Sequence, residues 1–132
     1  MFFCRQESLA SNDPSKILKE ARKIIEEIRD KCRENGHTTL FIKSSGLKSK
    51  PKFYIEDFHY HIESKWLHDM AGRYSLIPCV FELLRFTRDE PTLSREKNYY
   101  LEGITADEKK FKVIVRKERS GYVLQSFFRV RE

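Results

Sequence analysis

The chain has 132 residues, which suits one domain over 1–132 and leaves little room for a second. Its formal net charge is +6 and its pI is about 9.3, and chains this basic attract polyanions such as nucleic acids. Charged residues make up 35% of the chain, but both signs are mixed with 10 Phe and 6 Tyr, which argues against a disordered protein. The 3 cysteines include no CxxC pair, so neither a disulfide framework nor a zinc site is expected.

The first residues do not resemble a signal peptide. Arg5 and Glu7 follow a short apolar start, and no apolar run approaches the roughly 18 residues of a membrane span. We therefore expect a cytoplasmic protein with no membrane partner. Residues 1–12 lack periodicity, so we expect them to form a flexible lead-in.

An amphipathic helix over 14–35 is the most regular pattern in the chain. Asp13 suits the N-cap and Pro14 the first helical position, and Gly36 suits the end of the helix. Apolar residues recur between them at helical spacing: Ile17, Leu18, Ala21, Ile24, Ile25, Ile28 and Cys32.

Three shorter segments follow this helix. The β-branched and aromatic stretch 38–43 predicts a strand, and 53–55 predicts a second extended piece. Between them, the polar stretch 44–52 predicts a basic loop. Its Lys48 and Lys50 are candidates for contact with a nucleic acid.

Two more helices and three strands complete the expected fold. The helices are predicted at 58–70 and 75–88, with Pro78 in the first turn of the second one. Alternating apolar residues and a turn signal at Ser120 and Gly121 predict strands at 99–104, 111–117 and 122–130. We therefore expect an α+β protein whose N-terminal helices pack on a C-terminal antiparallel β-meander.

Three of the four histidines lie close together, at positions 59, 61 and 68. His61 and His68 would lie two turns apart on one face of the expected helix. Three interpretations remain open: structural residues, metal ligands, or a general acid and base beside a phosphate. Imidazole suits the last role because it titrates near neutral pH. The chain has neither a Gly-rich phosphate loop nor an HExxH motif, which argues against NAD, ATP and zinc-hydrolase chemistry.

The last two strands predict a basic sheet face whose members depend on the hairpin register. A two-residue turn pairs Lys112 with Arg129, Ile114 with Phe127 and Arg116 with Gln125, and it turns Val113, Val115, Leu124, Ser126 and Phe128 toward the helices. A three-residue turn instead places Ser126 and Phe128 on the face of Lys112 and Arg116. Either face suits a single-stranded nucleic acid, since cations meet phosphates and rings stack on bases. The alternative is the ordinary solvent side of a half-buried sheet.

Five motifs carry a resemblance to a known family, in the order HIESKWLH, RYSLIPCVFELLR, NYYLEG, KFKVIVRKE and GYVLQSFF. Together they resemble the phage-associated branch of the barnase–EndoU–colicin–RelE (BECR) group of metal-independent ribonucleases. The resemblance covers roughly 53–130 and so marks 53–132 as a nuclease-like core. It leaves 13–52, the N-terminal helix and basic loop, as an added subdomain or a surface for an inhibitor protein.

The resemblance implies a BECR-like fold and RNA cleavage without a metal or cofactor, in which the ribose 2′-OH attacks the adjacent phosphorus. It implies that His61 and His68 are the candidates for acid and base, and that Arg116 holds the phosphate with Lys112 in support. It also implies that Ser126 hydrogen-bonds a phosphoryl oxygen or positions a reacting group. The wide spacing of the two histidines leaves both as candidates. With the sheet face and the basic loop included, the expected nucleic-acid contacts are Lys112, Tyr100, Phe128, Arg129, Lys48 and Lys50.

Three functional hypotheses follow. The first is a toxin-like or phage-associated endoribonuclease that cleaves RNA by 2′-OH transesterification, with tRNA as one candidate substrate and an inhibitor or antitoxin protein as a second partner. The alternative is a non-catalytic module that binds RNA or a protein through its basic sheet face. The third is a structural or regulatory domain whose basic face meets only solvent.

Overall fold

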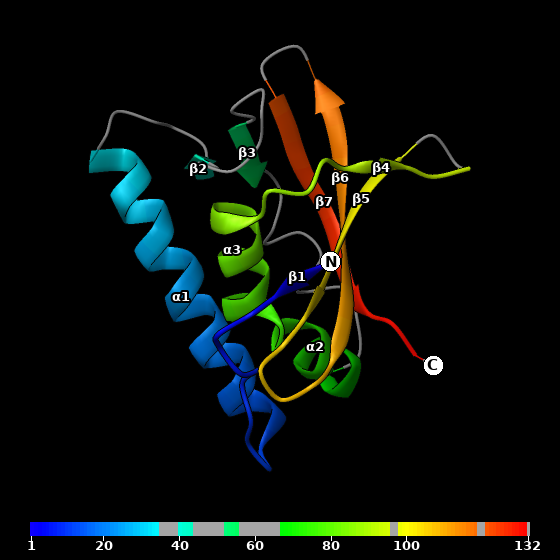
Figure 1. Ribbon diagram of the computed structural model, residues 1–132. Coiled ribbons are helices and arrows are strands. Elements are labelled where there is room, and N and C mark those ends of the chain that lie inside the picture. Colours follow the sequence, from blue (N-terminus) through cyan, green and yellow to red (C-terminus); the bar gives the residue numbers. More distant parts are fainter. Residues whose placement is uncertain (35–39, 44–51, 56–66, 96–97, 119–120, 132) are drawn as a thin grey trace.

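The central sheet of this protein draws strands from both ends of the chain (Figure 1). A computed structural model describes residues 1–34, 40–43, 52–55, 67–95, 98–118 and 121–131. Within these ranges the elements are, in chain order, β1 (Phe2–Phe3), α1 (Pro14–Glu34), β2 (Leu40–Lys43), β3 (Lys52–Ile55), α2 (Leu67–Tyr74), α3 (Ile77–Phe86), β4 (Thr92–Leu93), β5 (Tyr99–Ile104), β6 (Lys110–Glu118) and β7 (Gly121–Arg129).

The antiparallel meander predicted from the sequence is present as β5, β6 and β7. The strand order is β1-β5-β6-β7-β3-β2, and β4 also pairs with β5. Because β1 runs parallel to β5 and β3 runs parallel to β7, the sheet is mixed. The expected α+β class is confirmed, and the sheet extends beyond the meander on both sides.

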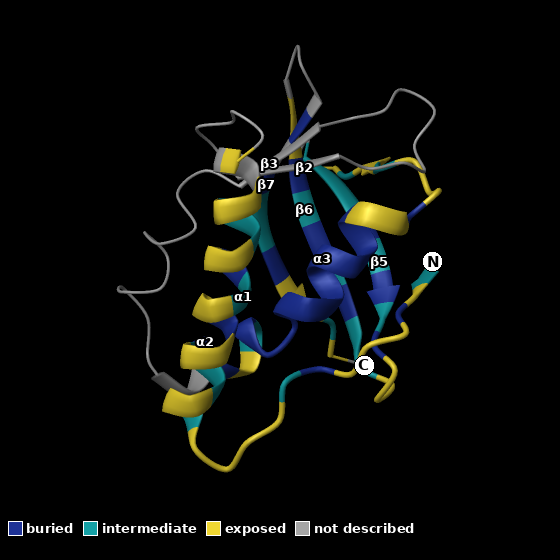
Figure 2. Ribbon diagram, turned by 90° about the vertical axis from the view of Figure 1, so that its left-hand side faces the viewer, coloured by how far each residue is buried: buried dark blue, intermediate teal, exposed yellow. Residues whose placement is uncertain are grey.

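Helices α1 and α3 lie on one face of the sheet, and α2 lies at its lower end in the view of Figure 1 (Figures 1 and 2). The predicted start of α1 is confirmed, since Asp13 Oδ1 accepts a hydrogen bond from the Ser15 backbone N–H at 3.0 Å. The apolar stripe of α1 buries Ala21 and Ile25 completely. Most of the expected helix at 58–70 falls outside the described residues, and α2 continues to Tyr74.

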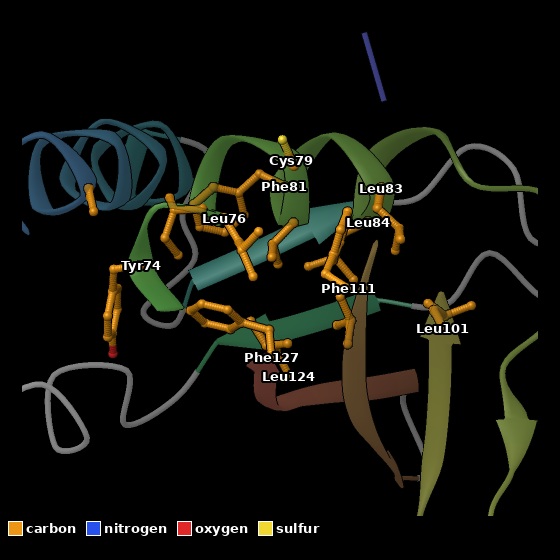
Figure 3. Close-up of a cluster of buried hydrophobic side chains, with 14 of the residues drawn as sticks. Tyr74, Leu76, Cys79, Phe81, Leu83, Leu84, Leu101, Phe111, Leu124 and Phe127 are labelled. Carbon is orange, nitrogen blue, oxygen red and sulfur yellow. The ribbon is translucent and has the colours of Figure 1, made fainter. Parts of the chain in front are cut away.

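A layer of apolar side chains between α3 and the meander forms the core (Figure 3). Leu83 and Leu84 of α3 and Phe111 of β6 are fully buried in it. Gly103 of β5 makes room for this layer, because a Cβ at that position would lie 2.6 Å from Phe111 Cζ. Each buried Leu or Phe contributes roughly 1.5–3 kcal/mol, so this layer is the main source of stability.

A β-bulge in β7 decides which residues face outward. Ile114 pairs with Ser126, but Val115 pairs with Leu124, so Gln125 is an extra residue on β7. Leu124 and Phe127 are both buried, although residues three apart face opposite sides of a regular strand. The extra residue allows both of them to enter the core.

The register predicted for a two-residue turn is therefore wrong. The register predicted for a three-residue turn holds only between Phe111 and Ile114 of β6, on one side of the bulge. Lys112 pairs with Phe128, which is 42% exposed, and Arg116 pairs with Val123. Phe128 and Ser126 thus share the outer face of the sheet with Lys112. The expectation that they pack toward the helices fails because Phe127 fills that space.

Residues 2–9, most of the expected flexible lead-in, make regular contacts with the rest of the fold. Cys4 is buried, and its backbone N–H donates to Ile104 O at 2.8 Å. Glu82, buried in α3, accepts hydrogen bonds through its carboxylate from the backbone N–H groups of Arg5 at 2.8 and 3.0 Å and of Gln6 at 3.0 Å. This contact joins residues far apart in the sequence, so local periodicity did not predict it.

We expect Glu82→Ala to lower the free energy of unfolding by about 2–3 kcal/mol, because it leaves two backbone N–H groups without their charged acceptor. Urea denaturation followed by circular dichroism measures the change. Glu90→Ala is the matched control, since Glu90 is exposed and such a change costs less than about 0.5 kcal/mol. Equal stabilities of the two variants would contradict the role of Glu82.

Candidate nucleic-acid interface

A basic hollow lies at the lower end of the sheet in Figure 1, where α2, the β5–β6 turn and the end of β7 meet. Its volume is about 950 Å³. We call it the basic cleft and define it by its five cations: Arg73, Lys109, Lys110, Arg129 and Arg131. One carboxylate, that of Glu108, also lines it, so cations outnumber carboxylates in the lining and favour an anion.

The β5–β6 turn positions the two lysines of the cleft. The Thr105 backbone N–H donates to Lys109 O at 2.9 Å, and the Glu108 backbone N–H donates to Thr105 O at 3.0 Å. Glu108 has a φ of 65°, a left-handed conformation that is unusual for a residue with a side chain. The tight turn brings the start of β6 alongside the end of β7, where the Val130 backbone N–H donates to Lys110 O at 2.9 Å.

Arg73 of α2 connects the cleft to β7. Its Nε donates to Phe127 O at 2.7 Å, its Nη2 donates to the Ser126 hydroxyl, and its Cζ lies 5.3 Å from the centroid of the Phe127 ring. A guanidinium has five N–H donors in a rigid plane. These contacts therefore orient Arg73 in the cleft wall and leave donors for an anion.

Lys109 is held by a small polar network from the N-terminal segment. Its Nζ donates to Ser8 Oγ at 2.8 Å and lies 3.4 Å from Asp107 Oδ2. Asp107 accepts from the Ser8 backbone N–H at 2.8 Å and from the Ser8 hydroxyl at 2.6 Å. Partial burial opposes ionisation of Asp107, but hydrogen bonds from Ser8 and Thr105 outweigh it and hold the pKa of this carboxyl well below its usual range.

The outer face of the meander carries a second group of basic and aromatic residues. Lys112 Nζ lies 4.6 Å from the centroid of the Tyr100 ring and 3.9 Å from Glu102 Oε1. Lys110 Nζ lies 3.8 Å from the other oxygen of Glu102. Phe128 belongs both to this face and to the lining of the basic cleft, so the two surfaces are continuous.

The residues expected to carry the chemistry are only partly brought together. Arg129 lines the basic cleft, and Ser126 is bonded to a cleft residue. Arg116 lies toward the opposite end of β6, about 20 Å along the strand from Lys110. His68 lies in α2, the helix that supplies Arg73.

The expected acid or base His61 and the expected nucleic-acid contacts Lys48 and Lys50 lie outside the described residues. Their roles stay predictions, as does that of Lys112 as support for Arg116.

Sequence reasoning missed Arg73, Arg131, Lys109 and Lys110 as members of one site. Arg73 stands at the start of RYSLIPCVFELLR, one of the motifs that carry the family resemblance, and that position was the available signal. The two lysines were assigned to a turn and a strand end, and only the tertiary structure places the chain end beside them.

Comparisons with protein-family models, with curated proteins and with solved structures give no match to this chain. The site must therefore be interpreted from its own geometry. None of the helices in the described part of the chain combines the length and apolar character needed to cross a bilayer.

We expect Asp107→Asn to destabilise the protein at neutral pH. The two carboxylate oxygens of Asp107 accept one hydrogen bond each from Ser8, whereas an amide has a single, uncharged acceptor oxygen. A lowered folded-state pKa contributes stability above the ordinary value of 3.8, and this contribution is lost as the pH falls below it. The stability difference between wild type and Asp107→Asn should therefore be constant near neutral pH and shrink in acid. Urea denaturation across this pH range measures it. Asp30→Asn, at an exposed position of α1, is the control, and a difference that does not vary with pH would refute the assignment.

Proposed function

We propose that this protein binds RNA through the basic cleft. The observation that carries the proposal is the convergence of five cations on one hollow from three separate parts of the fold. Guanidinium and ammonium groups form charge-assisted hydrogen bonds with phosphates, which are roughly twice as strong as neutral ones. A hollow lined by one sign of charge also raises the local concentration of a polyanion.

Two features favour RNA over other polyanions. Phe128 lies in the same wall as the cations, and an aromatic ring beside phosphate-binding groups suits a ligand with bases. The resemblance of 53–130 to BECR ribonucleases also points to RNA. A flat acidic membrane, by contrast, would meet convex basic surfaces more readily than the inside of a hollow.

The orientation and exposure of the cleft arginines also favour binding of an anion. Arg73 is already oriented by Phe127 O and Ser126, so fixing it on a phosphate costs little additional side-chain entropy. Arg129 and Arg131 are exposed, which leaves them accessible to a ligand that enters from solvent.

We expect the double variant Arg129→Ala/Arg131→Ala to weaken RNA binding and to reduce its salt dependence. Removing one cation that neutralises a phosphate of a single strand lowers the slope of log K against log salt by about 0.7, so the slope should fall by about 1.4. Glu108→Asn should act in the opposite direction, since it removes the one cleft carboxylate and asparagine tolerates a left-handed backbone.

Fluorescence anisotropy with a labelled RNA over a series of salt concentrations measures both effects. Arg88→Ala is the matched control, because Arg88 is exposed and lies outside the cleft. If the control and the double variant bind alike, or if wild-type protein binds no RNA at low salt, the cleft is not an RNA site.

We also propose a second function, metal-independent RNA cleavage at the wall of the same cleft. The specific observation is the hydrogen bond from Arg73 to the Ser126 hydroxyl, in a structure where α2 also contains His68. The 2′-oxygen would form a bond to phosphorus as a base removes its proton, and the 5′-oxygen would leave with a proton from an acid. Arg73 would stabilise the charge that develops on the phosphoryl oxygens.

For the cleavage function we expect labelled RNA incubated in EDTA to give fragments that end in a 2′,3′-cyclic phosphate, with a 5′-hydroxyl on the other fragment. His61→Ala or His68→Ala should abolish the products, and Arg73→Lys should slow their formation by about 10²-fold because it removes the planar fork. Gel analysis with end-group mapping provides the measurement. RNA that stays intact while it remains bound would exclude cleavage and leave the binding function.

A further inference from the structure

Aromatic side chains occupy the outer face of the sheet on three different strands. Phe3 of β1 is 72% exposed and Phe128 of β7 is 42% exposed, while Tyr100 of β5 is half-buried. Phe3 pairs with Ile104, and Phe128 pairs with Lys112. Since paired residues face the same side and residues two apart along a strand share it, all three rings belong to one face.

This open face has no helix on it among the described elements, because α1 and α3 cover the opposite side (Figures 1 and 2). Two exposed rings and one half-buried ring on the uncovered side of a sheet offer separate flat apolar surfaces to a partner. The cations between them indicate the charge of the partner. Lys110 and Lys112 lie on the strand between β5 and β7, and Glu102 is the one carboxylate close to both among the described residues.

The spacing of the rings restricts the form of the partner. With strands about 4.8 Å apart and a rise of about 3.3 Å per residue, Phe3, Tyr100 and Phe128 stand roughly 12–16 Å from one another. Bases in a duplex are stacked about 3.4 Å apart along each strand. Three rings this far apart can each take a base only from a strand whose bases are separated from one another.

We infer that the open face holds an extended single strand, with bases stacked on Phe3, Tyr100 and Phe128 while the backbone of the same strand continues into the basic cleft. Phe128 is the junction, because it belongs to both surfaces. This inference rests on the proposed RNA-binding function and adds its substrate class: unpaired RNA, selected over duplex. Lys112 Nζ lies 4.6 Å from the centroid of the Tyr100 ring, so a base that stacks there displaces the ammonium group, which then contacts the neighbouring phosphate.

The experiment compares a single-stranded RNA with a hairpin duplex of equal length, both fluorescently labelled, for wild type, Phe3→Ala and Phe128→Ala. We expect wild type to bind the single strand at least about tenfold more tightly, and each variant to lose about fivefold or more of that affinity. Duplex binding, which depends on the cleft cations, should stay unchanged in Phe3→Ala, because Phe3 does not line the cleft. A single strand that contains 2-aminopurine should lose fluorescence on wild-type protein and retain more of it on the variants.

Phe86→Ala is the matched control, since Phe86 is 56% exposed but lies on α3, on the other side of the sheet. Unchanged thermal midpoints establish that the variants fold. Equal affinity of wild type for single strand and duplex, or full single-strand affinity in Phe3→Ala and Phe128→Ala, would overturn the inference. If Arg129→Ala/Arg131→Ala still weakens binding in that case, the basic cleft stands without the open face. Absence of binding to either RNA would remove both proposals.

Discussion

Burial of both Leu124 and Phe127 is the constraint on which the candidate binding surfaces depend. The two residues are three apart in β7 and both face the core, which a regular strand cannot achieve. The bulge at Gln125 resolves the conflict, and it has a second consequence for the outer face. It turns Ser126 and Phe128 to the outer face of the sheet. There Ser126 accepts a hydrogen bond from Arg73 of α2, and Phe128 joins the open face to the basic cleft.

The N-terminal segment contributes more to the site than its composition suggests. Glu82 anchors the backbone of Arg5 and Gln6, and this anchor allows β1 to add Phe3 to the edge of the sheet. The same segment carries Ser8, whose hydroxyl and backbone N–H connect Asp107 with Lys109 of the cleft. The same short segment therefore contacts both Glu82 in the core and Lys109 in the cleft, although its sequence shows no periodicity.

In the proposed function, the basic cleft and the open face would contact different parts of a nucleic acid. Cations in the cleft would supply an affinity that depends on salt and not on sequence, whereas rings on the open face would select bases that are free to stack. Arg73 takes the place near Ser126 that the sequence suggested for Arg116. It reaches β7 because, in the described part of the chain, the β3 pairing covers only the first residues of β7 and ends before Phe127.

The sequence alone determined the elements whose signals are local: the helix from Pro14, the helix that contains Pro78, the three strands of the meander and the α+β class. Their periodicity, caps and turn residues act within a few positions, so neighbours in the sequence specify them. Ser126, Phe128 and Arg129 were also marked as site residues. The tertiary structure decided the rest, namely the bulge, the parallel strand β1, and the convergence of Arg73, Lys109 and Arg131. These depend on contacts between distant residues, such as pairs 53 and 101 positions apart, which core packing sets and no local pattern encodes.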